Sequence, residues 1–315
     1  MRASTLHRIL AGAALPLALT AAVVLAFSQR SPEARGDERG PGDVVRRLPP
    51  PLYRDLPRKD ALRFRAVIGS VVVDRGPLQP PAAETVEVGT SLQGRTMDAY
   101  LLGSGPRLVV LIGGLHTGEE AETVAVASAL LAHYREHPEA IPPEVTLAII
   151  PLANPDGLAL GSRVNARGVD LNRNWPTGDW ADPAVHGDEV VSAGAAPLSE
   201  PETAALYAFL QARRPELVIT WHGYASLIEG NDLSAAEMYA KTFAQATGYD
   251  YIDRWTLYPI TGELLTAMQD LGIPAIDVEL ARGDVAAVER NLAGVEAVLE
   301  QVAADGPTAQ SAQHR

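Results

Sequence analysis

Two patterns of hydrophobic residues alternate along the central part of the chain. Short continuous apolar runs predict buried strands at 107–112, 145–150, 217–221 and 275–280. Apolar residues at helical spacing predict helices at 119–134, 199–213, 234–247 and 284–302. Strands that alternate with helices indicate an α/β fold, with a mixed, mostly parallel central sheet and helices on both faces.

The start of the chain has the pattern of an export segment. Arg2 and Arg8 precede an uncharged run over residues 9–27. This run is long enough to span a bilayer, and it is longer than the usual core of a cleaved signal peptide. An uncleaved anchor and a cleaved signal both remain open, and both place the rest of the chain outside the cytoplasm. We therefore expect residues 1–27 to be a signal anchor or signal peptide and the protein to be extracytoplasmic, either membrane-anchored or secreted.

The segment that follows cannot bury enough apolar surface to fold. Prolines are interleaved with charged residues over 28–60, which is typical of a linker. The last residues, 305–315, resemble this segment and predict a flexible tail. The folded catalytic domain is therefore expected at 61–304.

Composition and charge restrict the chemistry. The 315 residues include no cysteine, which excludes disulfides, thiolate zinc sites and a cysteine nucleophile. A metal must then be held by His, Asp or Glu. The formal net charge of −13 disfavours nucleic acid as a partner, because phosphate backbones are repelled by an acidic protein. Contact with a membrane is expected only through the N-terminal segment.

Candidate metal ligands follow two of the predicted strands. His116 and Glu119 lie in GGLHTGEE after strand 107–112, and His222 lies in VITWHGY at the end of strand 217–221. Parallel strands bring such positions to one edge of a sheet. Two histidines and one carboxylate can hold catalytic zinc and leave a position open for water. A plain helix start with an exposed histidine, and a core histidine at 222, are the alternatives.

Two further features can contribute charge at the same edge. The segment SRVNARGVDLNRNWP at 162–176 concentrates arginine and asparagine, which suits a site for a carboxylate or a developing oxyanion, or else a loop held together by its own side chains. Glu279 ends the apolar strand 275–280. Near a metal and water it could act as a general base, and the alternative is an ion pair with Arg282.

Together these motifs carry a family resemblance. GGLHTGEE, NPDG at 154–157, SRVNARGVDLNRNWP, PLSEPET, the strand end at His222 and Glu279 occur in the order found in zinc carboxypeptidases. The chain most resembles the bacterial branch related to murein tripeptide amidase A, from about Glu87 to about Arg282. One departure is HTGEE, where that branch commonly has a shorter His-Gly-Asp-Glu.

The resemblance implies a role for each matching residue. It implies one Zn²⁺ per chain held by His116, Glu119 and His222, with Asp170 orienting the first histidine. Catalysis would be carried by Glu279 as general base and acid and by Arg163, which would polarise the scissile carbonyl. Substrate binding would fall to Asn172 and Arg173, clamping a terminal carboxylate, and to Tyr258, whose surroundings match the family only loosely.

These features predict a zinc metallocarboxypeptidase or peptide amidase that hydrolyses an amide next to a free carboxylate, with cell-wall (murein-derived) peptides as candidate substrates. A zinc deacylase of N-acyl amino acids and a non-catalytic peptide-binding module on the same scaffold are the alternatives. The specificity pocket is expected between Tyr258 and Glu279, lined by Glu263, Leu264, Leu265 and Met268. The three apolar residues favour an apolar terminal residue or simply form a helix core face, whereas Glu263 favours a diamino acid.

Overall fold

A computed structural model describes residues 65–68, 71–74, 83–283 and 287–305. The chain divides into two units, Met1–Leu78 and Gln79–Arg315. In the first unit, β1 (Arg65–Ile68) and β2 (Val71–Asp74) form an antiparallel pair. The predicted export segment at 1–27, the linker at 28–60 and the tail beyond 305 lie outside the described residues.

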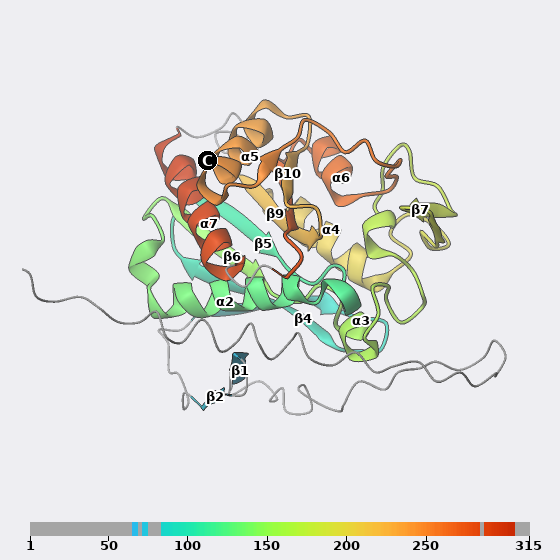
Figure 1. Ribbon diagram of the computed structural model, residues 1–315, viewed down its shortest axis with the longest axis horizontal. Helices are drawn as coiled ribbons and strands as arrows, with labels where there is room; N and C mark the ends of the chain where they lie inside the picture. The colour runs from blue at the N-terminus through green and yellow to red at the C-terminus, as the bar shows by residue number, and fades with distance from the viewer. Residues whose placement is uncertain (1–64, 69–70, 75–82, 284–286, 306–315) are drawn as a thin grey trace, which may run out of the picture. The chain divides into compact units, whose positions relative to one another are not determined.

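The second unit is built around an eight-stranded mixed sheet with the order β11-β10-β12-β9-β5-β6-β4-β3 (Figure 1). The four central strands are parallel to one another, whereas β10, β4 and β3 run antiparallel to their inner neighbours. The strands are β3 (Glu84–Thr90), β4 (Thr96–Gly103), β5 (Arg107–Ile112), β6 (Val145–Ile150), β9 (Leu217–Gly223), β10 (Leu227–Gly230), β11 (Asp250–Tyr251) and β12 (Ala275–Leu280). A separate hairpin is formed by β7 (Ala184–His186) and β8 (Glu189–Val191).

Helices cover both faces of the sheet (Figure 1). One face packs against α2 (Glu122–Glu136), α5 (Ser234–Thr247) and α7 (Ala287–Ala304), and the other against α4 (Pro201–Arg213) and α6 (Leu264–Asp270). The central strands are buried on both sides, so their sequences are nearly continuous apolar runs. The predicted α/β class is confirmed. The shorter helical elements are α3 (Pro155–Leu160), η1 (Gly118–Glu120), η2 (Pro138–Ala140) and η3 (Leu171–Arg173).

The parallel strands bring three functional segments to one edge. β5, β9 and β12 are neighbours and point the same way, so their carboxyl ends meet. His116 follows β5, His222 is near the end of β9, and Glu279 is its Cα partner on β12. Ligands of open α/β sheets bind at such an edge.

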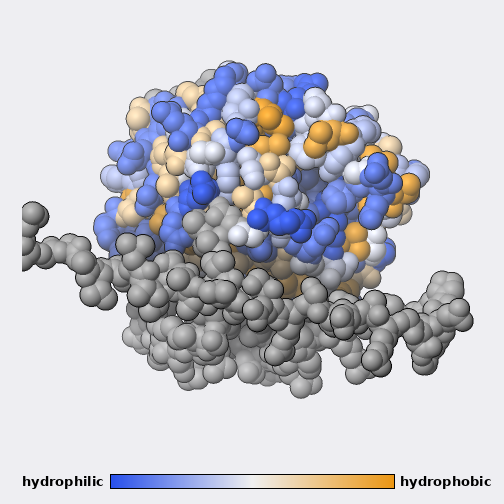
Figure 2. All heavy atoms as spheres, viewed as in Figure 1, coloured by the Kyte–Doolittle hydropathy of each residue, from blue (hydrophilic) through white to orange (hydrophobic). Residues whose placement is uncertain are grey.

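The visible face of the described residues is largely polar. Figure 2 shows mostly hydrophilic residues on the visible coloured face, with small scattered hydrophobic patches. Among the described residues, no helix is long and apolar enough to cross a membrane.

Candidate active site

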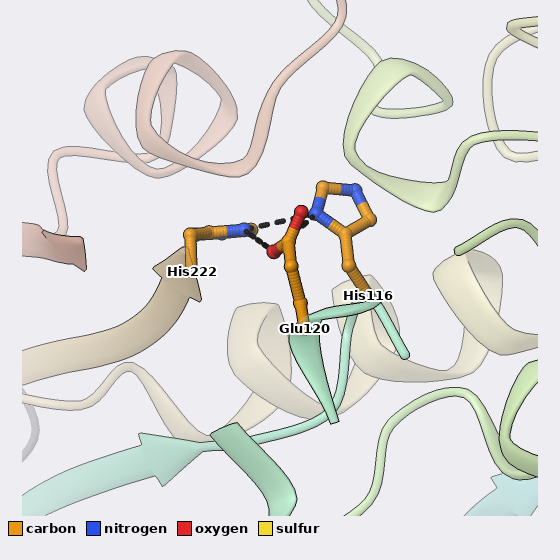
Figure 3. A group of neighbouring side chains, drawn as sticks. All are labelled: His116, Glu120 and His222. Atoms are coloured by element: carbon orange, nitrogen blue, oxygen red, sulfur yellow. Dashed lines mark hydrogen bonds and ion pairs between the residues drawn. The ribbon is translucent and has the colours of Figure 1, made fainter. Parts of the chain in front are cut away.

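Two histidines and one glutamate converge at the carboxyl edge of the sheet (Figure 3). Nδ1 of His222 lies 3.0 Å from Nδ1 of His116. Oε2 of Glu120 lies 3.3 Å from Nδ1 of His116 and 3.7 Å from Nδ1 of His222. All three side chains are buried. Among the described residues, they are the one group of three or more His, Cys, Asp or Glu side chains whose ligand atoms lie close enough together to hold a metal ion.

The glutamate of this group is Glu120, and this corrects the sequence prediction of Glu119. Gly118 has a φ of +67°, and the chain turns there into η1. The turn exposes the side chain of Glu119, while its backbone carbonyl accepts a hydrogen bond from the Tyr224 hydroxyl. Glu120, the last residue of η1, turns its carboxylate toward His116. In the HTGEE segment, motif spacing therefore indicated Glu119, whereas the adjacent residue Glu120 contacts the histidines.

A shell of charged groups fixes the group in place. Asp170 Oδ1 lies 2.8 Å from His116 Nε2, which leaves Nδ1 of that ring to face the centre. Arg163 donates from Nε to Asp170 Oδ2 over 3.2 Å and also pairs with Glu120. Such carboxylate–histidine contacts set the tautomer and orientation of metal-binding histidines. The predicted position of Asp170 behind the first histidine is observed.

The pKa values of His222 and Glu120 suit metal binding. Burial and the charge of Arg163 lower the pKa of His116, but Asp170 and Glu120 outweigh them and raise it. Burial lowers the pKa of His222 to about 4, so this ring is neutral near pH 7 and can act as a ligand. Burial disfavours the charged form of Glu120, but His116, hydrogen bonds from both histidines and Arg163 outweigh it and hold the pKa well below its usual value. Glu120 is therefore an anion.

The geometry of the group fits Zn²⁺. Two ligands at about 2.0–2.2 Å in a tetrahedral site lie roughly 3.3–3.6 Å apart. The three nitrogen and oxygen atoms here are separated by 3.0, 3.3 and 3.7 Å. Imidazole and carboxylate are also ligands that zinc accepts, and a fourth position is left for water.

A cavity of about 280 Å³ opens beside this group. Its walls contain most of the predicted site residues together with several that the sequence did not indicate. The lining residues are His116, Glu120, Arg163, Asn172, Arg173, His186, His222, Gly223, Tyr224, Ala225, Leu227, Glu229, Trp255, Leu257, Tyr258, Ile260, Glu263, Asp277 and Glu279.

Asn172 and Arg173 lie together in η3 on one wall of the cavity. Asn172 Oδ1 accepts a hydrogen bond from the Leu264 amide at 2.9 Å. Arg173 donates to the backbone carbonyls of Val185 at 3.0 Å and Asn172 at 2.8 Å. The guanidinium is thus held in one orientation, as the recognition of a planar carboxylate requires.

Glu279 faces the same cavity from β12. Burial, followed by the negative charge of Glu120, raises the pKa of Glu279 to about 7. A carboxyl group with this pKa can accept and return a proton near neutral pH. No ion pair with Arg282 is found among the described residues; the Arg282 guanidinium lies 4.4 Å from the ring centre of Tyr224.

Tyr258 lies at the rim of the cavity among other rings. Its ring centre is 5.3 Å from that of Trp255 and 5.9 Å from that of His186. Burial raises the pKa of Tyr258, so its hydroxyl is protonated and can donate a hydrogen bond. No sequence motif indicated His186, which the fold brings here on the hairpin β7–β8.

Only part of the predicted specificity segment lines the cavity. Glu263 lines the cavity just before α6, where it accepts a hydrogen bond from the Thr266 hydroxyl at 3.0 Å. Leu264, Leu265 and Met268 do not line it and pack in the hydrophobic core under α6. Helical spacing turns these three apolar side chains toward the sheet, so they form a core face and give no evidence of an apolar substrate.

Two acidic lining residues were missed. Glu229 of β10 and Asp277 of β12 are cross-strand partners and face the cavity. Asp277 lies two residues before Glu279, on the same face of β12. A carboxylate inside an otherwise apolar strand could have indicated Asp277 as well as Glu279, because both residues lie in the strand AIDVEL.

Comparison with known proteins places the chain in a family. A family model described as "Zinc carboxypeptidase" matches residues 77–252, more than half of the chain. Murein peptide amidase A from Escherichia coli is 34% identical over 163 residues, which cover 48% of this chain and 62% of that protein. The chain thus spans about three-fifths of the length of this curated relative.

Solved structures agree with the sequence comparison. The crystal structure of murein-tripeptide amidase from Escherichia coli matches with a TM-score of 0.56 at 27% identity, over 73% of this chain and 95% of that chain. Carboxypeptidase A from Helicoverpa armigera matches in fold, with a TM-score of 0.57 and 22% identity over 70% of this chain and 68% of that chain.

Fold and site therefore define a zinc carboxypeptidase-like protein with a His–Glu–His group that could hold a metal ion. The chain belongs to the zinc carboxypeptidase family and is related to murein tripeptide amidase.

Proposed function

We propose that this protein hydrolyses the amide bond next to a free terminal carboxylate, as a carboxypeptidase or peptide amidase. The observation that carries the proposal is that one cavity is lined by three kinds of group. These are the possible metal ligands His116, Glu120 and His222, the Glu279 carboxyl group with a pKa of about 7, and the arginines Arg163 and Arg173. Zn²⁺ held by His116, Glu120 and His222 would supply a Lewis acid for the attack of water on the amide carbonyl.

The chain's own residues divide the remaining work. Asn172 and Arg173 bind the terminal carboxylate and fix the scissile bond. Arg163 donates to the carbonyl oxygen as negative charge develops there, and Tyr258 closes the rim over the substrate. Glu279 takes a proton from the attacking water as the C–O bond forms. It returns this proton to the leaving nitrogen as the C–N bond breaks, so that no net proton is consumed at Glu279.

We also propose that the substrates are cell-wall peptides and that the protein acts outside the cytoplasm. The names of the relatives support the first point, and the apolar run at 9–27 supports the second. Export is tested by separating cytoplasmic, membrane and external fractions of producing cells. Detection in the cytoplasmic fraction alone would contradict it.

The reaction is tested on matched peptides with a free or an amidated C-terminus, with an N-acyl amino acid as a third substrate. The zinc-loaded protein should release the last residue of the free peptide only. Turnover should disappear on chelation and return with Zn²⁺. Exclusive cleavage of the N-acyl amino acid would indicate the deacylase, and no cleavage of any substrate by zinc-loaded protein would indicate the binding module.

A further inference from the structure

Three carboxyl groups form an acidic wall in the cavity, which we define as Glu229, Glu263 and Asp277. Glu229 and Asp277 face each other across β10 and β12, and Glu263 immediately precedes α6. Burial, followed by repulsion from Glu263, raises the pKa of both Glu229 and Asp277.

Two buried oxygen atoms of the acidic wall lack a hydrogen-bond partner in the protein. Oε2 of Glu229 and Oδ1 of Asp277 have no hydrogen-bond partner, although the two residues are only 8% and 7% exposed. No lysine or arginine among the described residues forms an ion pair with any member of the wall. Oδ2 of Asp277 lies 3.9 Å from Nε2 of His222, a ring that burial keeps neutral near pH 7. Buried carboxylate oxygens without partners are costly, so the arrangement favours a ligand that brings the missing positive charge.

The two arginines whose charge lowers the pKa of wall residues, Arg254 and Arg173, are already engaged elsewhere. Arg254 is exposed and pairs with both carboxylate oxygens of Asp232, at 2.9 and 3.1 Å. Arg173 donates to two backbone carbonyls in its own region. Both affect the acidic wall only through their charge.

The geometry also limits the kind of cation. Three ligand atoms that hold one metal ion must lie close together, and among the described residues only His116, Glu120 and His222 satisfy this. The oxygens of the acidic wall are therefore too far apart to hold one metal ion together. An organic cation on a flexible stem, such as an alkylammonium or a guanidinium group, can contact several of them.

The acidic wall adjoins the expected binding site of the terminal carboxylate. The Leu264 amide, directly after Glu263, donates to Asn172 Oδ1, and the Trp175 amide donates to the Gly262 carbonyl at 3.0 Å. Burial raises the pKa of Glu263, and the hydrogen bond from Thr266 and the charge of Arg173 oppose the rise. One amino acid can thus contact Arg173 with its carboxylate and the acidic wall with its side chain.

We infer that the acidic wall selects a terminal residue whose side chain is a cation without a second carboxylate, such as lysine, ornithine or arginine. This inference rests on the proposed function for the placement of the substrate. Diaminopimelate carries an ammonium group and a carboxylate at the far end of its side chain. That carboxylate would face the like charges of the acidic wall, so diaminopimelate should bind more weakly than lysine.

The test is binding of free amino acids to the zinc-loaded full-length protein, measured by calorimetry. L-Lysine, L-norleucine and diaminopimelate are compared, because norleucine has the lysine stem without its ammonium group. Lysine should bind at least about tenfold more tightly than norleucine, since a hydrogen bond to a charged group contributes roughly 1.5–3 kcal/mol. Lysine should also bind more tightly than diaminopimelate.

Glu229→Gln and Glu263→Gln should each remove most of the preference for lysine over norleucine. The control is Glu237→Gln, which changes the same charge on an exposed residue of α5 that is paired with Lys241 and lies outside the cavity. Circular dichroism and zinc content check the fold, and the second variant is decisive if the first does not fold.

Equal binding of lysine and norleucine, or no binding of any of the three, would overturn the inference. Diaminopimelate binding as tightly as lysine would overturn the exclusion of a second carboxylate. Selective lysine binding without peptide cleavage would refute the proposed function alone, whereas cleavage without a preference for lysine would refute this inference alone.

Discussion

Two glutamates in the same cavity have opposite surroundings. Glu120 is 2% exposed and contacts His116, Arg163 and the Gly223 amide, and its pKa is held well below the usual value. Glu229 is 8% exposed, and burial and the charge of Glu263 raise its pKa to about 7. Burial alone therefore does not decide the charge of a carboxyl group, because the neighbouring charges do.

The difference separates two kinds of preorganisation. On the metal side, the protein supplies both signs of charge and holds the ligands in position before a metal binds. On the acidic wall, it supplies one sign only, so the ligand must bring the other. A metal cofactor suits the first arrangement, and recognition of a substrate side chain suits the second.

The largest expected effect is at Glu279, which lies between these two regions. Glu279→Gln keeps the size of the side chain but cannot accept a proton. Turnover should fall about 10²–10⁴-fold with little change in zinc content or substrate affinity. Steady-state kinetics and elemental analysis check this, and a variant with unchanged turnover would remove Glu279 from the catalytic role.

The metal side is tested by two neighbouring glutamates. Glu120→Gln should weaken zinc binding at least about 100-fold because an anionic ligand is lost, whereas Glu119→Gln should bind zinc as the parent protein does. His116→Ala and His222→Ala should also lose most of the metal. Zinc titration against a competing chelator measures all four, and a larger loss in Glu119→Gln would restore the assignment made from motif spacing.

Loss of Arg173, which is proposed to bind the terminal carboxylate, should have an intermediate effect on activity. Arg173→Ala should reduce kcat/KM roughly 10–100-fold for peptides with a free C-terminus, because a charge-assisted hydrogen bond is lost. Any residual cleavage of amidated peptides should change much less. Equal loss for both substrates would show that Arg173 supports the structure and does not read the carboxylate.

The smallest expected effect is that of Glu229 on the free energy of unfolding, and this effect depends on pH. The raised pKa of Glu229 means that the folded protein binds this proton more tightly than the unfolded chain does. The contribution of the Glu229 carboxyl group to the stability of the fold is therefore fully present below about pH 4.5, and it is lost as the pH rises through about 7.

Glu229→Gln removes this loss. Thermal unfolding should show the variant more stable than the parent by roughly 1–2 kcal/mol at pH 8, with less difference at pH 5. The gain is below the full value of the pKa shift because the amide also lacks hydrogen-bond partners. Destabilisation by the same amount at both pH values would contradict the raised pKa.

The fold could be predicted where burial is complete. The predicted strands 107–112, 145–150 and 275–280 have the observed bounds, and 217–221 is extended by two residues. These strands form the contiguous centre of the sheet. The four outer strands were not predicted, because partly exposed strands lack a continuous apolar run.

The sequence by itself determined the α/β class, the central strands and several of the residues that line the cavity, because strand ends and motifs are local patterns. Only the tertiary structure decided which glutamate joins the histidines, since a turn at Gly118 rotates Glu119 outward and Glu120 inward. It also decided that Glu229 and Asp277 face each other, because their pairing joins strands 48 residues apart in the chain. Contacts of this kind depend on register between distant segments, and no local pattern records that register.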